Sequence, residues 1–255
     1  MNRPRLLLVP PFSELQWVIR DQLEEWADVA SFDPPGVGEE PLPEGFELDS
    51  ERPGVLSKWR RLTVERGLRE ADGLGWDQFV VVTDGDGGPA AVGVATARPA
   101  AIQGLALGHA ALSRSMQGDR APLNRQVWEA MGQLMRQDRE SFVRYGIAQM
   151  TQGSVDEALA TRMLERFPNM DIVAGLWELL AQDPEPMEDE LMALRERGVP
   201  FLLAKHEGCL GSTDEGYEDI VAAFPDARTV SCPEACEVSP AFAQALREFC
   251  AEIGA

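Results

Sequence analysis

The sequence has little positive charge. Its 255 residues include 23 lysines and arginines against 43 aspartates and glutamates, so the formal net charge at pH 7 is −20. Nucleic acids and anionic membrane surfaces are bound by clustered lysines and arginines. The charge balance therefore argues against both as partners. It suits a neutral or cationic ligand, or it serves solubility alone.

Long hydrophobic runs are missing as well. No apolar run approaches the roughly 20 residues that a membrane-spanning helix needs. The apolar stretch behind the basic N-terminus covers only residues 6–10, which is too short for a signal peptide. We therefore expect no membrane partner and a cytoplasmic location.

Histidine and cysteine are scarce. The two histidines are His109 and His206, and the four cysteines are Cys209, Cys232, Cys236 and Cys250. A zinc site needs more closely spaced ligands than these residues offer, and a proline separates Cys232 from Cys236. We expect no metal ion, no other cofactor, and thiols that stay reduced in the cytoplasm.

Apolar runs do alternate with helical segments along most of the chain. Runs that suit buried parallel strands cover residues 5–10, 28–32, 76–83, 100–107, 199–204 and 227–231. Helical patterns cover residues 14–26, 59–71, 86–97, 188–197, 214–224 and 240–253. This order predicts right-handed βαβ units and an α/β fold, with a mostly parallel sheet of about six strands flanked by helices.

Residues 118–185 interrupt the alternation. They are rich in methionine and helix-forming residues, and no strand-like pattern occurs in them. Helices are expected over 150–161, 162–167 and 171–180. The segment predicts a helical cap over 118–185, inserted into a core made of residues 1–117 and 186–255.

A glycine-rich turn follows the run at 79–83. It reads Asp84-Gly85-Asp86-Gly87-Gly88, and the small residues after it suit a helix. A strand, a sharp turn and a helix form the elbow that presents the nucleophile in α/β-hydrolases, within a small-x-nucleophile-x-Gly frame. Gly85 stands where this frame needs the reactive side chain. The elbow is therefore predicted without its nucleophile.

Several stretches in the right order make most of the chain resemble the α/β-hydrolase superfamily. They are residues 6–12 for the oxyanion loop, 33–38 for the Asp-x-x-Gly-x-Gly loop, 81–91 for the elbow, 118–185 for the cap, and 199–203 with 224–249 for the last strands and helix. The oxyanion loop departs from the family because Pro10-Pro11 replaces the usual His-Gly. The resemblance implies the α/β-hydrolase fold with a helical cap insert.

The resemblance also locates the catalytic triad, in the order nucleophile, acid, histidine. These positions hold Gly85, Cys209 and Glu237, and Glu207 is the carboxylate nearest to the acid position. None of the three side chains is the one that hydrolysis requires. Substitution at all three positions predicts a degenerate triad.

The binding pocket of the fold is expected to persist around these positions. The predicted substrate-binding residues are Pro11, Phe12, Gly85, Asp86, His109, Ala110, Met150, Cys209 and Glu237. The amide groups of Phe12 and Asp86 suit an oxyanion or a carbonyl oxygen. His206 ends a predicted strand, where it lines the pocket or serves the structure.

In length, missing triad and compact cap, the chain resembles the bottromycin epimerase type. These hydrolase-fold proteins lack the triad and epimerise an aspartate in a modified peptide. The resemblance implies a cofactor-independent epimerase in antibiotic biosynthesis, acting on a peptide natural-product intermediate. A substrate carboxylate would remove the neighbouring Cα proton, and Arg98, Arg114 and Arg120 are candidate partners for that carboxylate. We expect a monomer or a homodimer with a peptide-like or small-molecule substrate.

Two alternatives stay open. Asp84 or Asp86 is a carboxylate nucleophile, as in dehalogenases and epoxide hydrolases of this fold, although each is one residue out of register. Otherwise the chain is a pseudo-hydrolase that binds a small molecule or peptide without catalysis. Deuterium uptake at the Cα of a substrate separates proton transfer from binding alone.

Overall fold

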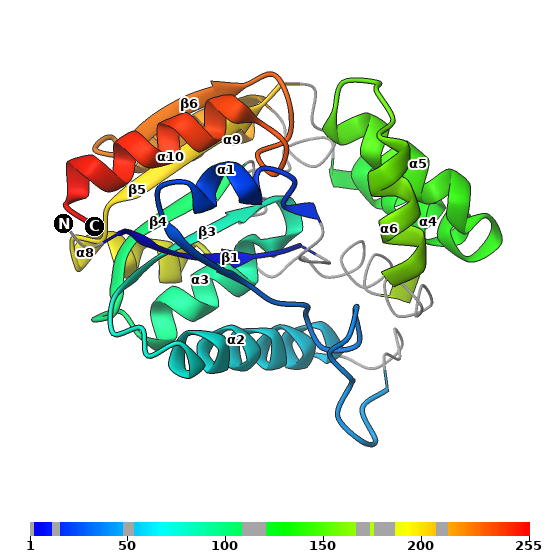
Figure 1. Ribbon diagram of the computed structural model, residues 1–255, viewed down its shortest axis with the longest axis horizontal. Helices are drawn as coiled ribbons and strands as arrows, with labels where there is room; N and C mark the ends of the chain where they lie inside the picture. Colours follow the sequence, from blue (N-terminus) through cyan, green and yellow to red (C-terminus); the bar gives the residue numbers. More distant parts are fainter. Residues whose placement is uncertain are drawn as a thin grey trace.

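The computed structural model describes residues 3–11, 16–47, 54–108, 121–166, 174–175, 187–207 and 214–255. These residues form a parallel sheet with helices packed on both of its faces. Figure 1 shows this core, with the helices α4 (Ala121–Gln137), α5 (Arg139–Met150) and α6 (Glu157–Arg166) set to one side of it.

The sheet of the described residues has six strands. They are β1 (Arg5–Val9), β2 (Asp28–Ser31), β3 (Phe79–Asp84), β4 (Ile102–Gly108), β5 (Phe201–His206) and β6 (Arg228–Cys232). Their spatial order is β2-β1-β3-β4-β5-β6, and every neighbouring pair is parallel. The chain therefore extends the sheet in one direction through β2 and in the other from β3 onward. Such a reversal creates a crevice at the carboxyl ends of β1 and β3, where open α/β sheets bind ligands.

Helices connect the strands. They are α1 (Arg20–Glu24), α2 (Val55–Gly73), α3 (Gly88–Ala97), α4 (Ala121–Gln137), α5 (Arg139–Met150), α6 (Glu157–Arg166), α8 (Glu188–Glu196), α9 (Asp214–Ala223) and α10 (Pro240–Ile253). Side chains of α2, α3, α8 and α9 pack on one face of the sheet, and those of α1 and α10 pack on the other.

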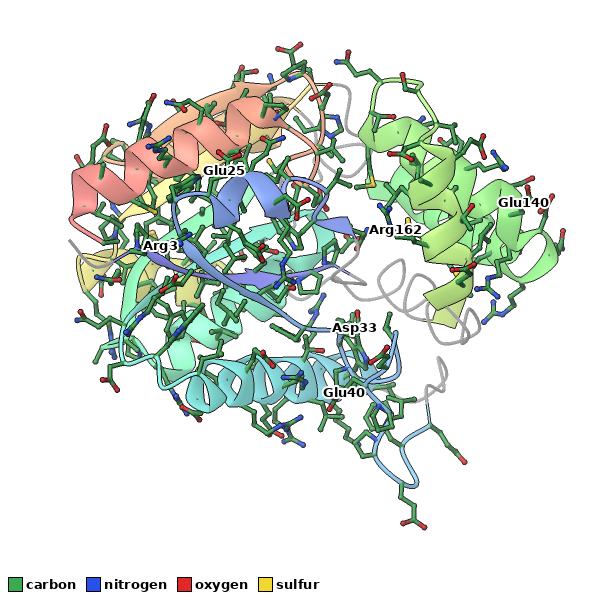
Figure 2. All side chains as sticks on the ribbon, in the orientation of Figure 1. Arg3, Glu25, Asp33, Glu40, Glu140 and Arg162 are labelled. Carbon is green, nitrogen blue, oxygen red and sulfur yellow. The ribbon has the colours of Figure 1, made fainter. Side chains whose placement is uncertain are left out.

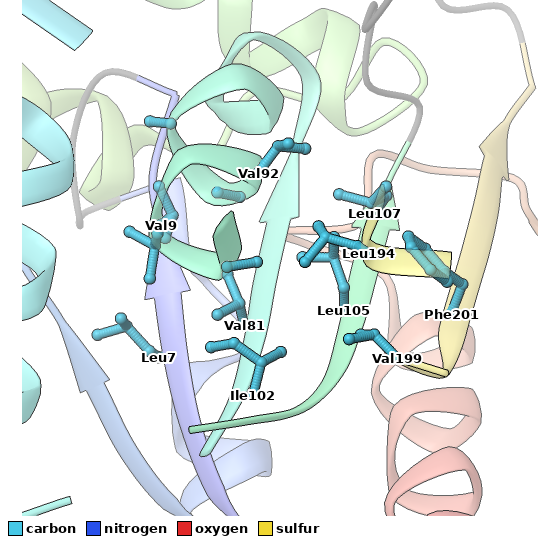
Figure 3. Close-up of a cluster of buried hydrophobic side chains, with 14 of the residues drawn as sticks. Leu7, Val9, Val81, Val92, Ile102, Leu105, Leu107, Leu194, Val199 and Phe201 are labelled. Carbon is cyan, nitrogen blue, oxygen red and sulfur yellow. The ribbon is translucent and has the colours of Figure 1, made fainter. Parts of the chain in front are cut away.

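The alternation of side chains along each strand builds two cores. Leu7 and Val81 belong to the core under α3, which Figure 3 shows, whereas Leu8 and Val82 belong to the core under α10. All six residues of β3 are buried, because strands flank β3 on both sides and helices cover both faces. This double burial explains the unbroken apolar run that precedes the elbow.

A third apolar cluster joins the start of α2 to the helices α4, α5 and α6. Trp59 of α2 is in this cluster, together with Met135, Ile147 and Met163. Met135 and Met163 therefore pack in the apolar cluster, and Met135 is only 1% exposed. The predicted cap limits at 118 and 185 lie outside the described residues and stay predictions.

The helix boundaries within this region differ from the prediction. The helix expected over 150–161 is wrong, because α5 ends at Met150 and α6 begins at Glu157. Gly153 between them has a left-handed φ of 96°. Asp156 then accepts hydrogen bonds from the amides of Ala158 and Leu159. A glycine turn followed by an N-terminal cap ends one helix and starts the next.

The first predicted helix, over 14–26, is also too long. The described part of this segment forms a helix only over α1, Arg20–Glu24. Trp17 and Ile19 are instead buried at 3% and 1% exposure, and the amide of Ile19 donates to the carbonyl oxygen of Glu237 at 3.0 Å. Packing against the distant loop therefore overrides the local helical pattern.

The strand boundaries shift by up to three residues, and β3 begins at Phe79 rather than at residue 76. His206 is the last residue of β5, as predicted. Within the described part of the chain, no helix combines the length and apolar character that crossing a membrane requires.

Candidate functional site

The elbow forms where the sequence predicts it. β3 ends at Asp84, a single 3-10 turn covers Gly85–Gly87, and α3 follows at Gly88. Gly85 has a left-handed φ of 50°, which side-chain-bearing residues adopt with strain. Among the described residues, no heavy atom beyond its chain neighbours would lie within 4 Å of a Cβ atom added to Gly85. The position predicted for a nucleophile therefore carries no side chain, and no described residue packs against it.

Gly87 has the opposite environment. A Cβ atom there would lie 2.4 Å from Oγ1 of Thr83, 2.9 Å from the carbonyl oxygen of Val9 and 3.1 Å from the nitrogen of Pro11. The turn thus packs directly against the end of β1 and needs glycine for this close approach. The contact places predicted site residue Pro11 beside the elbow.

Asp84 connects the elbow to the loop between β6 and α10. Its side chain is 4% exposed, and its two oxygens accept hydrogen bonds from the amides of Gly85 and Cys236, each at 2.8 Å. Gly108 of β4 allows this packing, because a Cβ there would lie 2.6 Å from the Asp84 carboxylate and 2.5 Å from Sγ of Cys236. Asp84 therefore holds two loops together rather than projecting into open space.

Glu237 occupies the position predicted for the histidine. Glu237 is 4% exposed, and its carboxyl group hydrogen-bonds to that of Asp84. Burial, followed by the charge of Asp84, raises the pKa of Glu237 well above its ordinary value. Both effects favour the protonated form of Glu237. A carboxyl group thus lies at the position where the sequence comparison predicted the histidine.

Asp86 is the more accessible carboxylate of the elbow. It directly follows Gly85 and is half-buried, unlike Asp84 and Glu237. Burial and the charge of Asp84 raise the pKa of Asp86 to about 6, while Arg60 of α2 acts in the opposite direction. Such a carboxyl group exchanges its proton near neutral pH, as acid–base chemistry requires.

A histidine and two thiols lie close to the same carboxylates. His206 is 9% exposed, and burial lowers its pKa although Asp84 acts to raise it. Cys232 and Cys236 are fully buried, and their thiols hydrogen-bond to each other. This bond lowers the pKa of Cys232, and burial raises that of Cys236. Within the described ranges no group of three His, Cys, Asp or Glu side chains is arranged to hold a metal ion.

The helices beside the core contact the same loop. The amide of Ala235 donates to the carbonyl oxygen of Met150 at 3.1 Å, and the side-chain amide of Gln152 donates to the carbonyl oxygen of Pro233. Met150, a predicted site residue, is the last residue of α5. Its carbonyl group therefore lies against the loop that carries Glu237.

Pro11, Gly85, Asp86 and Glu237 thus lie together around the elbow. The predicted residues Phe12, His109, Ala110 and Cys209, and the candidate arginines Arg114 and Arg120, lie outside the described residues. Arg98 does not belong to the site, because its guanidinium pairs with both carboxylate oxygens of Asp72 at the surface.

Sequence reasoning missed a further arginine, Arg162 of α6. Its side chain is exposed and lies on the side of α6 toward the core in Figure 2, whereas Glu140 lies on the outer side. Among the described residues Arg162 has no ion-pair or hydrogen-bond partner. By contrast, Arg144 of α5 pairs with Glu140 and Glu157. The sequence offers one signal that separates these two arginines, because Glu140 lies four residues before Arg144, whereas Ala158 lies four residues before Arg162.

No protein-family model and no curated protein matches this chain. Solved structures do match it. The putative ancestral haloalkane dehalogenase AncHLD2 (node 2) is 19% identical and covers 99% of this chain and 92% of its own, with a TM-score of 0.73. The enol-lactonase from Burkholderia xenovorans LB400 is 17% identical, covers 98% and 92%, and has a TM-score of 0.69.

A more distant match is the 2-hydroxy-6-oxo-6-phenylhexa-2,4-dienoate hydrolase from Rhodococcus sp. strain RHA1. It is 16% identical, covers 90% of this chain and 82% of its own, and has a TM-score of 0.65. Identities this low show the fold and leave the activity open. The chain has the α/β-hydrolase fold, with a six-stranded parallel sheet flanked by helices, and this prediction is confirmed.

Proposed function

We propose that this protein is a cofactor-independent epimerase that moves a Cα proton of a carboxylate-bearing substrate without forming a covalent intermediate. The observation that carries the proposal is Gly85, which has no side chain at the predicted nucleophile position and no described residue packed beside it. The position predicted for the histidine holds Glu237, whose carboxyl group is hydrogen-bonded to Asp84 and has a raised pKa. Acyl transfer needs a nucleophile and a base, and this arrangement offers neither in the usual place.

Proton transfer requires less machinery than hydrolysis. A substrate carboxylate next to an acidic C–H bond removes its own proton once the two groups are held in a dry site. The enolate that results needs hydrogen-bond donors, and the amides at the elbow turn supply them. The start of α3 adds the positive end of a helix dipole to the same place.

Arg162 supports a substrate that carries a carboxylate. An unpaired guanidinium is a strong ligand for a carboxylate. The chain has a net charge of −20, and arginines such as Arg66 and Arg144 pair with its acidic side chains. We infer a peptide-like substrate, such as an intermediate of an antibiotic peptide, because the resemblance to the bottromycin epimerase type implies one.

The alternative of an aspartate nucleophile is disfavoured for Asp84. A nucleophile must reach the substrate, but both Asp84 oxygens accept backbone hydrogen bonds and the residue is 4% exposed. Asp86 is accessible but lies one residue beyond the elbow position that faces open space. Binding without catalysis remains the alternative that the experiment below must separate from epimerisation.

The proposal includes a cytoplasmic location and a monomer or homodimer. Three cysteines of the described chain, Cys232, Cys236 and Cys250, are unpaired. Free thiols are typical of a reducing compartment.

The proposal is tested by incubating the protein in D2O with synthetic peptides that contain an internal L-aspartyl residue. One set has an ordinary amide after the aspartate, and a second has an activated thioester there, which makes the Cα–H more acidic. Mass spectrometry measures deuterium at Cα, and chiral chromatography after acid hydrolysis measures D-aspartate. We expect both with the protein and neither with the matching asparaginyl peptides.

Two outcomes would contradict the proposal. Binding of the peptides without deuterium uptake would identify a pseudo-hydrolase. Turnover of ester, haloalkane or epoxide substrates that disappears in Asp86→Asn would identify a carboxylate nucleophile instead.

A further inference from the structure

Epimerisation creates a demand that a substrate carboxylate cannot meet alone. When the site holds the substrate side chain in one rotamer, its carboxylate reaches only one face of the Cα atom. If it removes the proton and returns it, the original configuration is restored. Inversion requires a second group that delivers a proton to the opposite face. This inference therefore rests on the proposed function and names the protein group that completes the reaction.

The described part of the elbow offers few groups for this role. Asp84 and Glu237 are each 4% exposed, and their carboxyl groups are hydrogen-bonded to each other. His206 is 9% exposed at the end of β5. Asp86 alone among these four residues is half-buried rather than buried. It also directly follows Gly85, whose missing side chain leaves space on the ligand-binding edge of the sheet.

We propose that Asp86 is the catalytic residue that delivers the proton to the face of the substrate Cα opposite to the substrate's own carboxylate. The carboxylate of the substrate takes the Cα proton and leaves an enolate. The protonated Asp86 then gives its proton to the other face of that carbon, so the C–H bond is remade with inverted configuration. The substrate carboxylic acid and the Asp86 carboxylate finally exchange a proton through solvent, which restores the starting state.

The surroundings of Asp86 suit a group that must be protonated in one half of the cycle. Burial raises the pKa of Asp86, the charge of Arg60 of α2 lowers it and the charge of Asp84 of β3 raises it, and together they bring it to about 6. Asp86 in turn raises the pKa of Glu237 in the β6–α10 loop through its charge. Both protonation states are therefore populated near neutral pH, which is the condition for efficient acid–base catalysis. The same carboxylate in water would be almost fully ionised there.

The competing role for Asp86, which lies in the turn before α3, is an ion pair with Arg60 of α2 that serves only the structure. An ion pair would affect stability and leave the ratio of two reaction outcomes unchanged. The informative readout is consequently the ratio of deuterium exchange with retention to exchange with inversion. It is measured on the same aspartyl peptides in D2O.

In Asp86→Asn we expect exchange with retention to continue and inversion to fall by about 100-fold, the size of a lost general acid. Asp77→Asn is the matched control, because Asp77 is exposed before β3; it should keep the wild-type ratio. A second test needs no variant. The inversion rate of the wild-type protein should fall relative to exchange as the pH rises above about 6.

Each result decides the matter. Equal ratios in Asp86→Asn and wild type, or a ratio independent of pH, would overturn the role of Asp86 while leaving the proposed epimerase intact. Loss of exchange together with inversion in a folded Asp86→Asn would also overturn it, since a donor alone is not needed for proton removal. Absence of any exchange in the wild-type protein would overturn the proposed function itself.

Discussion

The carboxyl group of Glu237 hydrogen-bonds to that of Asp84 inside the fold, where each residue is 4% exposed. Two buried carboxyl groups in contact cannot both ionise without strong repulsion, so the pair keeps one proton. That proton links the elbow to the loop after β6. The same loop carries the histidine in enzymes with an intact triad. The hydrogen bond thus joins two segments of the fold at the place where the histidine was predicted.

The pair predicts a distinctive pH dependence of stability. The pKa of Glu237 is raised in the folded protein from an ordinary value of 4.5. The folded chain therefore binds this proton more tightly than the unfolded chain does. Its contribution to stability is complete below pH 4.5 and is lost as the pH rises through the raised value. Glu237→Gln keeps a neutral hydrogen-bond donor and removes the titration.

Urea denaturation of wild type and Glu237→Gln at about pH 5 and about pH 8 measures this effect. We expect the variant to gain stability relative to wild type at the higher pH. Glu234→Gln controls for an added amide in the same loop. Glu237→Ala should destabilise the protein by about 1–3 kcal/mol at the lower pH, because Asp84 loses its partner. Parallel pH curves for wild type and Glu237→Gln would contradict the shared proton.

Gly85 and Gly87 form a matched pair that tests the geometry of the elbow. Gly85→Ala places a methyl group in open space and costs only the left-handed backbone strain, about 1 kcal/mol. Gly87→Ala pushes a methyl group against the backbone oxygen of Val9 and costs about 3 kcal/mol. Denaturation midpoints should follow this order. Equal losses would mean that position 85 is packed and the open space is absent.

The fold was largely predictable because its signal is local and repeated. The unbroken apolar run before Asp84 reflects burial on both faces of β3, and the glycines that follow mark a turn that only small residues can form. The limits of α10, Pro240–Ile253, were predicted without error. Ile19 shows where local patterns fail, because its amide bonds to Glu237 from the other end of the chain.

The site was only partly predictable. Gly85 and Glu237 could be singled out because the resemblance assigns the triad positions to them, and their roles stay predictions. The role of Asp84 was not, since its bonds to the amide of Cys236 and to Glu237 join segments distant in sequence. Arg162 was missed for a similar reason. The spacing to Glu140 indicates one partner of Arg144, but its second partner, Glu157, comes from another helix and depends on the fold.

The contact between α5 and the loop of Glu237 should depend on Gln152. Gln152→Asn keeps a residue that tolerates the left-handed φ of 53° at this position, but its shorter side chain does not reach the carbonyl oxygen of Pro233. We expect the amide of Ala235, bonded to Met150, to exchange its hydrogen about fivefold faster, the equivalent of about 1 kcal/mol. The control is Gln149→Ala, which changes an exposed residue of α5. Unchanged exchange at Ala235 would show that the backbone bond alone holds the contact.

Arg162 and Arg144 separate substrate binding from helix stability, because both extend from neighbouring helices of the same region. Arg144 is held by Glu140 and Glu157, so Arg144→Ala should lower stability slightly and leave peptide affinity unchanged. Arg162→Ala should weaken binding of an aspartyl peptide by about tenfold or more, as expected for a lost charge-assisted hydrogen bond. Calorimetry measures the affinity of the aspartyl and asparaginyl peptides for wild type and for Arg162→Ala, which makes a double-mutant cycle. The asparaginyl peptide should bind both proteins equally. An equal loss for both peptides would show that Arg162 contributes packing rather than recognition of the carboxylate.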